Sequence, residues 1–140
     1  MSALTSELRA TLAGLAALLV PAGEGLPSAV EVGVDGALLD DVLRARPDLE
    51  EPLAALLRDV AGEQPAAALA RLRSDERERF ELLGLVVAGG YLMAPQVGAA
   101  LRYPGQEAKQ VDPHDVVSVI EDGLLDAVIE RGEIYRPTPR

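Results

Sequence analysis

The chain has 140 residues, of which 49% are hydrophobic but only 3% aromatic, and its formal net charge at pH 7 is -10. An excess of carboxylates disfavours partners that present phosphates, so we expect neither nucleic acid nor an anionic membrane surface as a ligand. The chain has no cysteine and one histidine, which excludes disulfides, thiol nucleophiles, thiolate metal sites and multi-histidine metal sites. A core with so few rings must be built from leucine, alanine and valine, and this composition favours helices over sheets.

The first expected element is an amphipathic helix that begins after a cap at Thr5 or Ser6 and ends before Pro21. Its apolar residues recur at helical spacing along one stripe: Leu8, Leu12, Leu15 and Leu19. The apolar run at residues 12–20 imitates part of a secretory signal, but no small-residue cleavage site follows it and it is too short to span a bilayer. We therefore expect a structural helix, no membrane insertion and a cytoplasmic location.

Two helical segments are expected within residues 28–61. Ser28 and Glu31 have the spacing of a capping box, in which each residue satisfies the backbone N–H of the other. A new helix start is expected at Asp35, and Asp48 is expected to cap the helix after it. Apolar residues at helical spacing give both segments one face for the core.

The longest expected helix runs from a cap at Ser74 to about Ala94, after a short helix over residues 66–73. A helix that is apolar around most of its circumference is typical of the centre of a bundle. The apolar residues of this segment are Phe80, Leu82, Leu83, Leu85, Val86, Val87, Tyr91 and Leu92. The pair Gly89-Gly90 indicates a place where another backbone packs closely.

The remaining segments are, in chain order, a short helical turn from residue 95, a loop at 102–111, an element at 113–121, a helix at 124–131 and an extended tail from about 133. Asp112-Pro113 signals a helix start, but the β-branched residues after it leave helix and short buried strand both open. We expect one all-α domain over residues 1–140, a compact bundle of about six to eight short helices joined by Pro/Gly-rich loops.

His114 is the one candidate for acid–base chemistry, because Asp115 or Glu121 would orient its imidazole. The alternative is structural: Asp112 caps a helix, and Pro113 suits the first helical position. No serine lies in a nucleophile elbow, the acidic residues lack the spacing of a calcium loop, and no phosphate-binding glycine pattern occurs. We expect no catalytic, cofactor-binding or metal-binding residue, with a small hydrolase or isomerase built on His114 as an alternative.

Two of the three tyrosines lie in or beside segments rich in proline and glycine. Tyrosine and arginine on rigid loops are typical anchors of protein interfaces, although a tyrosine that covers the bundle with its hydroxyl in water is equally consistent with the pattern. The expected partner interface consists of Tyr91, Arg102, Tyr103, Pro104, Gly105 and Tyr135.

Residues 80–106, FELLGLVVAGGYLMAPQVGAALRYPGQ, carry an ordered set of motifs. The motifs are Phe80, Gly90-Tyr91, Pro95 with Gly98, and Tyr103-Pro104-Gly105. Together with the leading helix, its Val-Pro-Ala end, the Pro-Ser-Ala segment after it and the C-terminal stretch EDGLLDAVIERGEIYRPTP, this order resembles the gluconate 2-dehydrogenase subunit 3 family. The likeness covers most of the chain.

The resemblance implies a non-catalytic accessory subunit that binds the large subunit of a flavin-dependent dehydrogenase of the glucose-methanol-choline type. That large subunit would hold FAD and oxidise a sugar, a sugar acid or another alcohol, so the resemblance implies no cofactor on this chain. The sequence departs from the family at Arg102, where glycine is usual, and in having no Arg-Arg export signal before the first helix. A self-associating helical protein, with a homodimer through the Tyr103 loop, is a further alternative.

Overall fold

The structure, a computed structural model, describes residues 4–108, 110, 112–132 and 134, except for the side chain of Asp115. The helices in these residues are α1 (Ser6–Leu19), α2 (Ala37–Ala45), the short 3-10 helix η1 (Pro47–Leu49), α3 (Glu50–Val60), α4 (Pro65–Asp75), α5 (Arg77–Met93), α6 (Pro95–Ala100), α7 (Pro113–Glu121) and α8 (Asp126–Arg131). Within the described ranges there is no strand, only an isolated bridge between Gly23 and Leu26. The predicted all-α class is confirmed.

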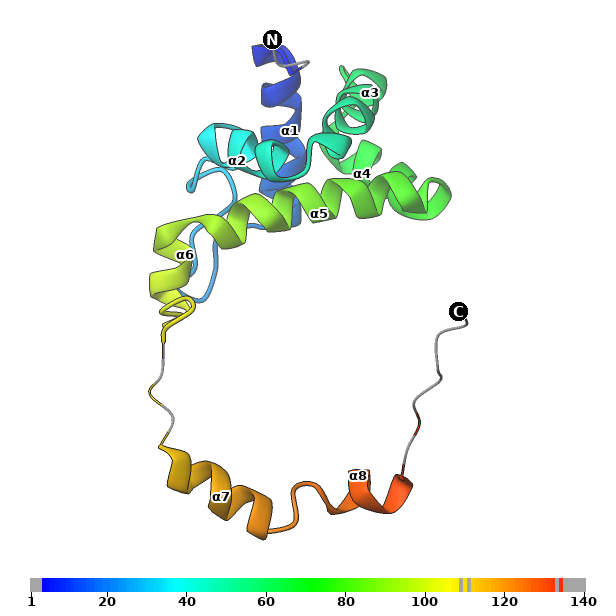
Figure 1. Cartoon of the computed structure of the whole chain (residues 1–140). Coiled ribbons are helices and arrows are strands. Elements are labelled where there is room, and N and C mark those ends of the chain that lie inside the picture. The colour runs from blue at the N-terminus through cyan, green and yellow to red at the C-terminus, as the bar shows by residue number, and fades with distance from the viewer. Residues whose placement is uncertain (1–3, 109, 111, 133, 135–140) are drawn as a thin grey trace. The chain divides into compact units, whose positions relative to one another are not determined.

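The contacts group the chain into two units, residues 1–105 and residues 106–140 (Figure 1). We call the first unit the body and the second the C-terminal unit. The body contains α1 to α6, and every buried residue in the described part of the chain lies in it. The single domain predicted over residues 1–140 stays a prediction. Apart from Ile134, the tail predicted from about residue 133 lies outside the described residues.

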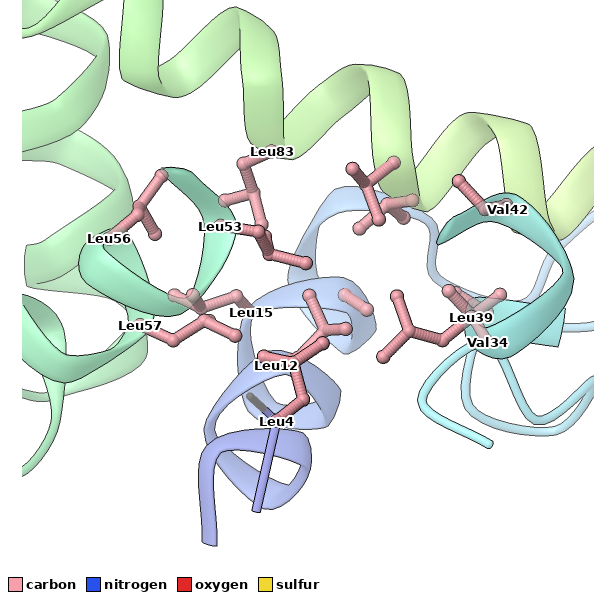
Figure 2. Close-up of a cluster of buried hydrophobic side chains, with 14 of the residues drawn as sticks. Leu4, Leu12, Leu15, Val34, Leu39, Val42, Leu53, Leu56, Leu57 and Leu83 are labelled. Carbon is pink, nitrogen blue, oxygen red and sulfur yellow. The ribbon is translucent and has the colours of Figure 1, made fainter. Parts of the chain in front are cut away.

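The core of the body is made almost wholly of leucine, valine and alanine. Figure 2 shows side chains from α1, α2, α3 and α5 pointing toward one another, among them Leu12, Leu39, Leu53 and Leu83, which are all fully buried. No polar or charged residue in the described part of the chain is buried. Aliphatic side chains fill the core in place of the rings that the composition lacks, and the hydrophobic effect drives this burial.

Helix α5 crosses the other helices of the body (Figure 1) and packs most extensively against α2. Its two consecutive glycines lie at this contact. A Cβ atom on Gly90 would lie 3.4 Å from Cγ1 of Val34, and one on Gly89 would lie 3.6 Å from Cγ2 of Val42. These neighbours are side chains at ordinary van der Waals distances, so a Cβ atom would fit at either glycine, and the close approach of another backbone predicted for the pair is not what the structure shows.

Two predicted caps are present. The backbone N–H of Leu8 donates to Oγ1 of Thr5 at 3.4 Å, which starts α1 as expected. The Ser28–Glu31 box is reciprocal: the N–H of Ser28 donates to Oε2 of Glu31 at 2.6 Å, and the N–H of Glu31 donates to Oγ of Ser28 at 3.2 Å. The box opens a series of turns rather than a helix, because Gly33 adopts a φ of 77° that breaks helical geometry.

Three predicted helix starts are wrong. Helix α2 begins after Gly36 with no side-chain cap, rather than at Asp35. Asp48 does not cap α3, because it lies inside η1 and its carboxylate binds the guanidinium of Arg46 at 2.7 Å and 2.8 Å. Ser74 lies inside α4, where its hydroxyl donates to the carbonyl of Arg71 at 3.2 Å. Ion pairing and helix continuation therefore prevailed over capping at these positions.

In the C-terminal unit, residues 113–121, for which helix and strand were both open, form helix α7. Asp112 caps it as expected, with Oδ1 accepting the backbone N–H of His114 at 2.9 Å. The last helix is shorter than predicted: residues 124–125 form a turn, and α8 begins at Asp126 and ends at Gly132, which has a φ of 70°.

Candidate functional site

The predicted interface residues centre on α6, and a single residue connects this helix to α5. Ala94 has an extended backbone, with φ -69° and ψ 124°, and is both the C-cap of α5 and the N-cap of α6. Pro95 occupies the first turn of α6, where its missing N–H has no cost. Because Ala94 and Val97 are buried, they attach this short helix firmly to the body.

The C-terminal end of α6 is a Schellman motif with an arginine at the left-handed position. The backbone N–H of Tyr103 donates to the carbonyl of Gly98 at 2.9 Å, and that of Arg102 donates to the carbonyl of Ala99 at 3.1 Å. In this motif the residue at position 102 needs a positive φ, which glycine adopts freely. Arg102 has a φ of 53°, at a cost of about 1–2 kcal/mol for a residue with a Cβ atom.

Large apolar side chains are exposed at both ends of α6. Leu92 and Met93 precede the helix, and Leu101 and Tyr103 follow it, with Tyr103 65% exposed. A helix of six residues is only about 9 Å long, so the two groups lie near each other. We call the set Leu92, Met93, Leu101, Arg102, Tyr103, Pro104 and Gly105 the α6 corner. Aromatic, Met and Arg side chains together are typical of the centre of a protein interface.

Of the other two residues of the predicted interface, Tyr91 is not at this surface, and Tyr135 is not described. Tyr91 is only 8% exposed, and its hydroxyl donates a hydrogen bond of 2.8 Å to the carbonyl of Pro27. It therefore packs in the core and holds the loop of residues 21–27 against α5. Tyr135 lies outside the described residues. The structure thus brings together Arg102, Tyr103, Pro104 and Gly105 at the surface, but not Tyr91.

His114 is exposed in the first turn of α7. Asp112 binds its backbone N–H, as a helix cap does, and not its ring. Glu121 is seven residues further along the same helix, a rise of about 10 Å. The side chain of Asp115, the other carboxylate of this alternative, lies outside the described part of the chain, so the hydrolase or isomerase built on His114 stays a prediction.

A network of ion pairs links α3, α4 and α5, and sequence reasoning missed it. Arg71 binds Glu63 at 2.8 Å and Asp59 at 3.2 Å, Arg79 binds Asp59 at 3.0 Å, and both arginines bind Glu76. Hydrogen bonds from Arg79 and Arg71 hold the pKa of Asp59 below its ordinary value. Asp59 lies on α3, Arg71 on α4 and Arg79 on α5, and Glu63 and Glu76 lie between helices, so no periodicity along one helix reveals the network as a whole. Each charge in the network has an opposite charge beside it, which makes the network a structural link.

Two hollows on the body are small or open. One of about 100 Å³ lies between α1 and α4 and is lined largely by Ala, Gly and Pro. The other, of about 300 Å³, is lined by Arg73, Arg77, Phe80 and Glu81, and Nε of Arg77 is bound to Glu81 at 2.7 Å. In the smaller hollow, the hydroxyl of Thr11 donates to the carbonyl of Glu7 at 3.1 Å, and the carboxylate of Glu63 is paired with Arg71 at 2.8 Å.

In the described ranges, no group of three or more His, Asp or Glu side chains is arranged to hold a metal ion. Within the same residues, no helix combines the length and the apolar character that crossing a bilayer requires. Comparison of the chain with protein families, with curated proteins and with solved structures found no match. The α6 corner is thus the candidate site that stands on geometry of this chain itself.

Proposed function

We propose that the chain is a non-catalytic accessory subunit that binds, through its α6 corner, the large subunit of a flavin-dependent sugar or alcohol dehydrogenase. FAD would be held by that partner, and no cofactor by this chain. The observation that carries the proposal is the backbone of Arg102, which is left-handed beside the exposed Tyr103.

The left-handed backbone supports the family resemblance. The family pattern has glycine before Tyr-Pro-Gly, and this chain has Arg102 there. Its φ of 53° is one that glycine would adopt without strain, so the loop has the backbone that the family pattern would favour. At position 102 this chain therefore differs from the family pattern in its side chain, while its backbone has a conformation that glycine would adopt.

The strain also supports a role for the arginine itself. A residue held in an unfavourable conformation costs stability, and such positions occur preferentially where a function requires the side chain. Arg102 is exposed and makes the end of α6 cationic on a chain whose net charge is -10. A guanidinium next to a tyrosine ring offers a partner both a charged hydrogen-bond donor and a large apolar contact.

The test is co-expression of the chain with a glucose-methanol-choline-type flavoprotein from the same genome, followed by size exclusion and a binding titration. We expect a stable complex, and we expect Tyr103→Ala and Leu101→Ser each to weaken it by about tenfold or more. Leu18→Ser is the matched control, because Leu18 lies on α1 and is 51% exposed, as Leu101 is. It should leave the affinity unchanged.

A chain that stays alone at micromolar concentration beside the flavoprotein would contradict the proposal. So would a complex that Tyr103→Ala and Leu101→Ser leave intact. A homodimer that these two substitutions dissociate would favour self-association through the same corner over the accessory subunit.

A further inference from the structure

Both helices of the C-terminal unit are amphipathic. On α7, Val116, Val117 and Ile120 share one face, since residues at i, i+1 and i+4 of a helix lie close together around its axis. Around α8, the apolar residues Leu125, Val128 and Ile129 likewise share a face. Carboxylates lie beside these faces: Glu121 is four residues after Val117 on α7, and Asp126 is three residues before Ile129 on α8. We call residues 112–131, which contain both helices, the acidic segment.

The acidic segment has no core of its own. Its large apolar side chains, which are Val116, Val117, Val119, Ile120, Leu124, Leu125, Val128 and Ile129, are all between 41% and 70% exposed. Burying these aliphatic side chains against a partner would be favourable, because the hydrophobic effect grows with the apolar area removed from water. Amphipathic helices of this kind gain most of their stability when the apolar face packs against another surface.

The charge of the segment indicates what that surface is. Residues 112–131 contain six carboxylates and a single basic side chain, Arg131. Anionic lipid headgroups and nucleic acid phosphates would be repelled. An apolar groove edged by lysine and arginine would satisfy both the apolar face and the carboxylates beside it.

This chain itself offers few unpaired basic side chains for such a groove. Residues 1–105 contain fifteen acidic and nine basic side chains. In the described part of these residues, seven of the nine arginines are already paired with carboxylates of the body. The body and a second copy of the chain are therefore both electrostatically unfavourable partners for the acidic segment.

We infer that the acidic segment is a helical docking element for another protein, one that presents an apolar groove edged by lysine or arginine. The inference goes beyond the proposed function, because it depends neither on the α6 corner nor on a flavoprotein partner. The contact is a helix in a groove, with the apolar faces of α7 and α8 against the floor and the carboxylates against the edges.

The first experiment is amide hydrogen exchange on the full chain alone. We expect the amides of residues 113–131 to exchange much faster than those of α5, because the large apolar side chains of the segment are exposed whereas α5 contributes to the core. Protection of the segment as strong as that of α5, or protection that appears with rising protein concentration, would show that the chain covers it itself and would overturn the inference.

The second experiment titrates the full chain with a synthetic amphipathic helix that carries leucines on one face and lysines on the other. The control peptide has glutamate in place of each lysine. We expect the lysine peptide to bind at least about tenfold more tightly than the glutamate peptide, with an affinity that falls as salt is added. Equal affinity for the two peptides, or no binding of either, would overturn the inference.

Two variants locate this binding. Val116→Asp combined with Ile120→Asp places charge on the apolar face of α7 and should weaken binding by about tenfold or more. Val30→Asp is the control, since Val30 of the body is 44% exposed and Val116 is 45% exposed. If the double variant unfolds α7, a second variant decides: Glu121→Gln, Asp122→Asn, Asp126→Asn and Glu130→Gln keep the apolar face and should lose the preference for lysine. Binding unchanged in both, or equal binding to phosphatidylcholine vesicles, would overturn the inference.

Discussion

The hydroxyl of Tyr91 donates a hydrogen bond of 2.8 Å to the carbonyl of Pro27, which lies 64 residues earlier in the chain. This bond ties the last part of α5 to the loop that leaves α1. The ring of Tyr91 is in the core, so its polar end needs a partner at the core boundary, and the loop carbonyl supplies one. Sequence position alone does not relate these two residues.

Tyr91→Phe removes this hydrogen bond and leaves the ring in place. We expect a loss of about 1 kcal/mol in the free energy of unfolding, because the carbonyl of Pro27 loses its donor in a partly buried site. Thermal unfolding followed by circular dichroism measures the change. Tyr103→Phe is the matched control. Tyr103 is exposed, so the melting temperature of this variant should equal that of the wild type. Equal melting temperatures for all three proteins would contradict the role of the bond.

Arg102→Gly relieves the left-handed strain at the end of α6. We expect a gain of about 0.5–1 kcal/mol in stability, since glycine adopts a φ of 53° freely but loses more backbone entropy on folding. Arg102→Ala keeps a Cβ atom and therefore the strain, so it should not be stabilised. Chemical denaturation measures both variants. If glycine stabilises the chain and weakens partner binding, the arginine is retained for contact at the expense of stability.

Leu83→Ala and Leu85→Ala compare the loss of stability at a buried and at an exposed position of α5. Leu83 lies on α5 and is fully buried against the other helices of the body. We expect its truncation to lower the free energy of unfolding by about 2–5 kcal/mol. Leu85→Ala, two residues along α5, should cost less than about 0.5 kcal/mol because Leu85 is 51% exposed. Denaturant midpoints of the two variants provide the comparison. Similar midpoints would mean that Leu83 is not in the core.

Asp59 should contribute to acid sensitivity. Its folded-state pKa is lowered by hydrogen bonds from Arg79 and Arg71, so the folded chain binds a proton at this site less readily than the unfolded chain. The contribution is therefore complete well above the ordinary value of 3.8 and is lost as the pH falls through that value and below it. Melting temperatures of the wild type should fall over this range, and those of Asp59→Asn should fall less.

Salt provides a check on the same network. The ion pairs of Asp59 are partly exposed, so added salt should screen them and reduce the difference between wild type and Asp59→Asn. Glu107→Gln, in the C-terminal unit, is the control and should keep the pH profile of the wild type. A wild-type profile in Asp59→Asn would mean that the network does not contribute to stability.

Local sequence patterns predicted the positions of most helices because those patterns act over a few residues. Thr5 caps α1 and Gly132 is the C-cap of α8, both as the sequence indicates. Ser74 and Asp48 failed as predicted caps for a common reason: each had an alternative partner or helix that no local rule could rank. The sequence did not decide between helix and strand for residues 113–121, because valine and isoleucine occur in both.

At the α6 corner, too, local sequence patterns predicted one feature correctly and missed another. The exposed Tyr103 beside Pro104 and Gly105 was predicted from proline and glycine around it, which act locally. Tyr91 was placed in the same surface by residue type, and it lies in the core instead. Helical spacing already puts Tyr91 on one apolar stripe with Leu83 and Val87, and this signal was the better guide to its place. The partner of its hydroxyl depends on where the loop of residues 21–27 runs, which periodicity along α5 does not show.

The sequence by itself determined that the chain is helical and acidic and that its core is aliphatic, because composition and short-range periodicity decide those properties. Only the tertiary structure decided that the hydroxyl of Tyr91 binds the carbonyl of Pro27, which arginines link α3, α4 and α5, and that Arg102 holds a left-handed backbone. These features arise from packing and hydrogen bonding, which in the first two cases join residues far apart in the chain and in the third depend on how α6 ends.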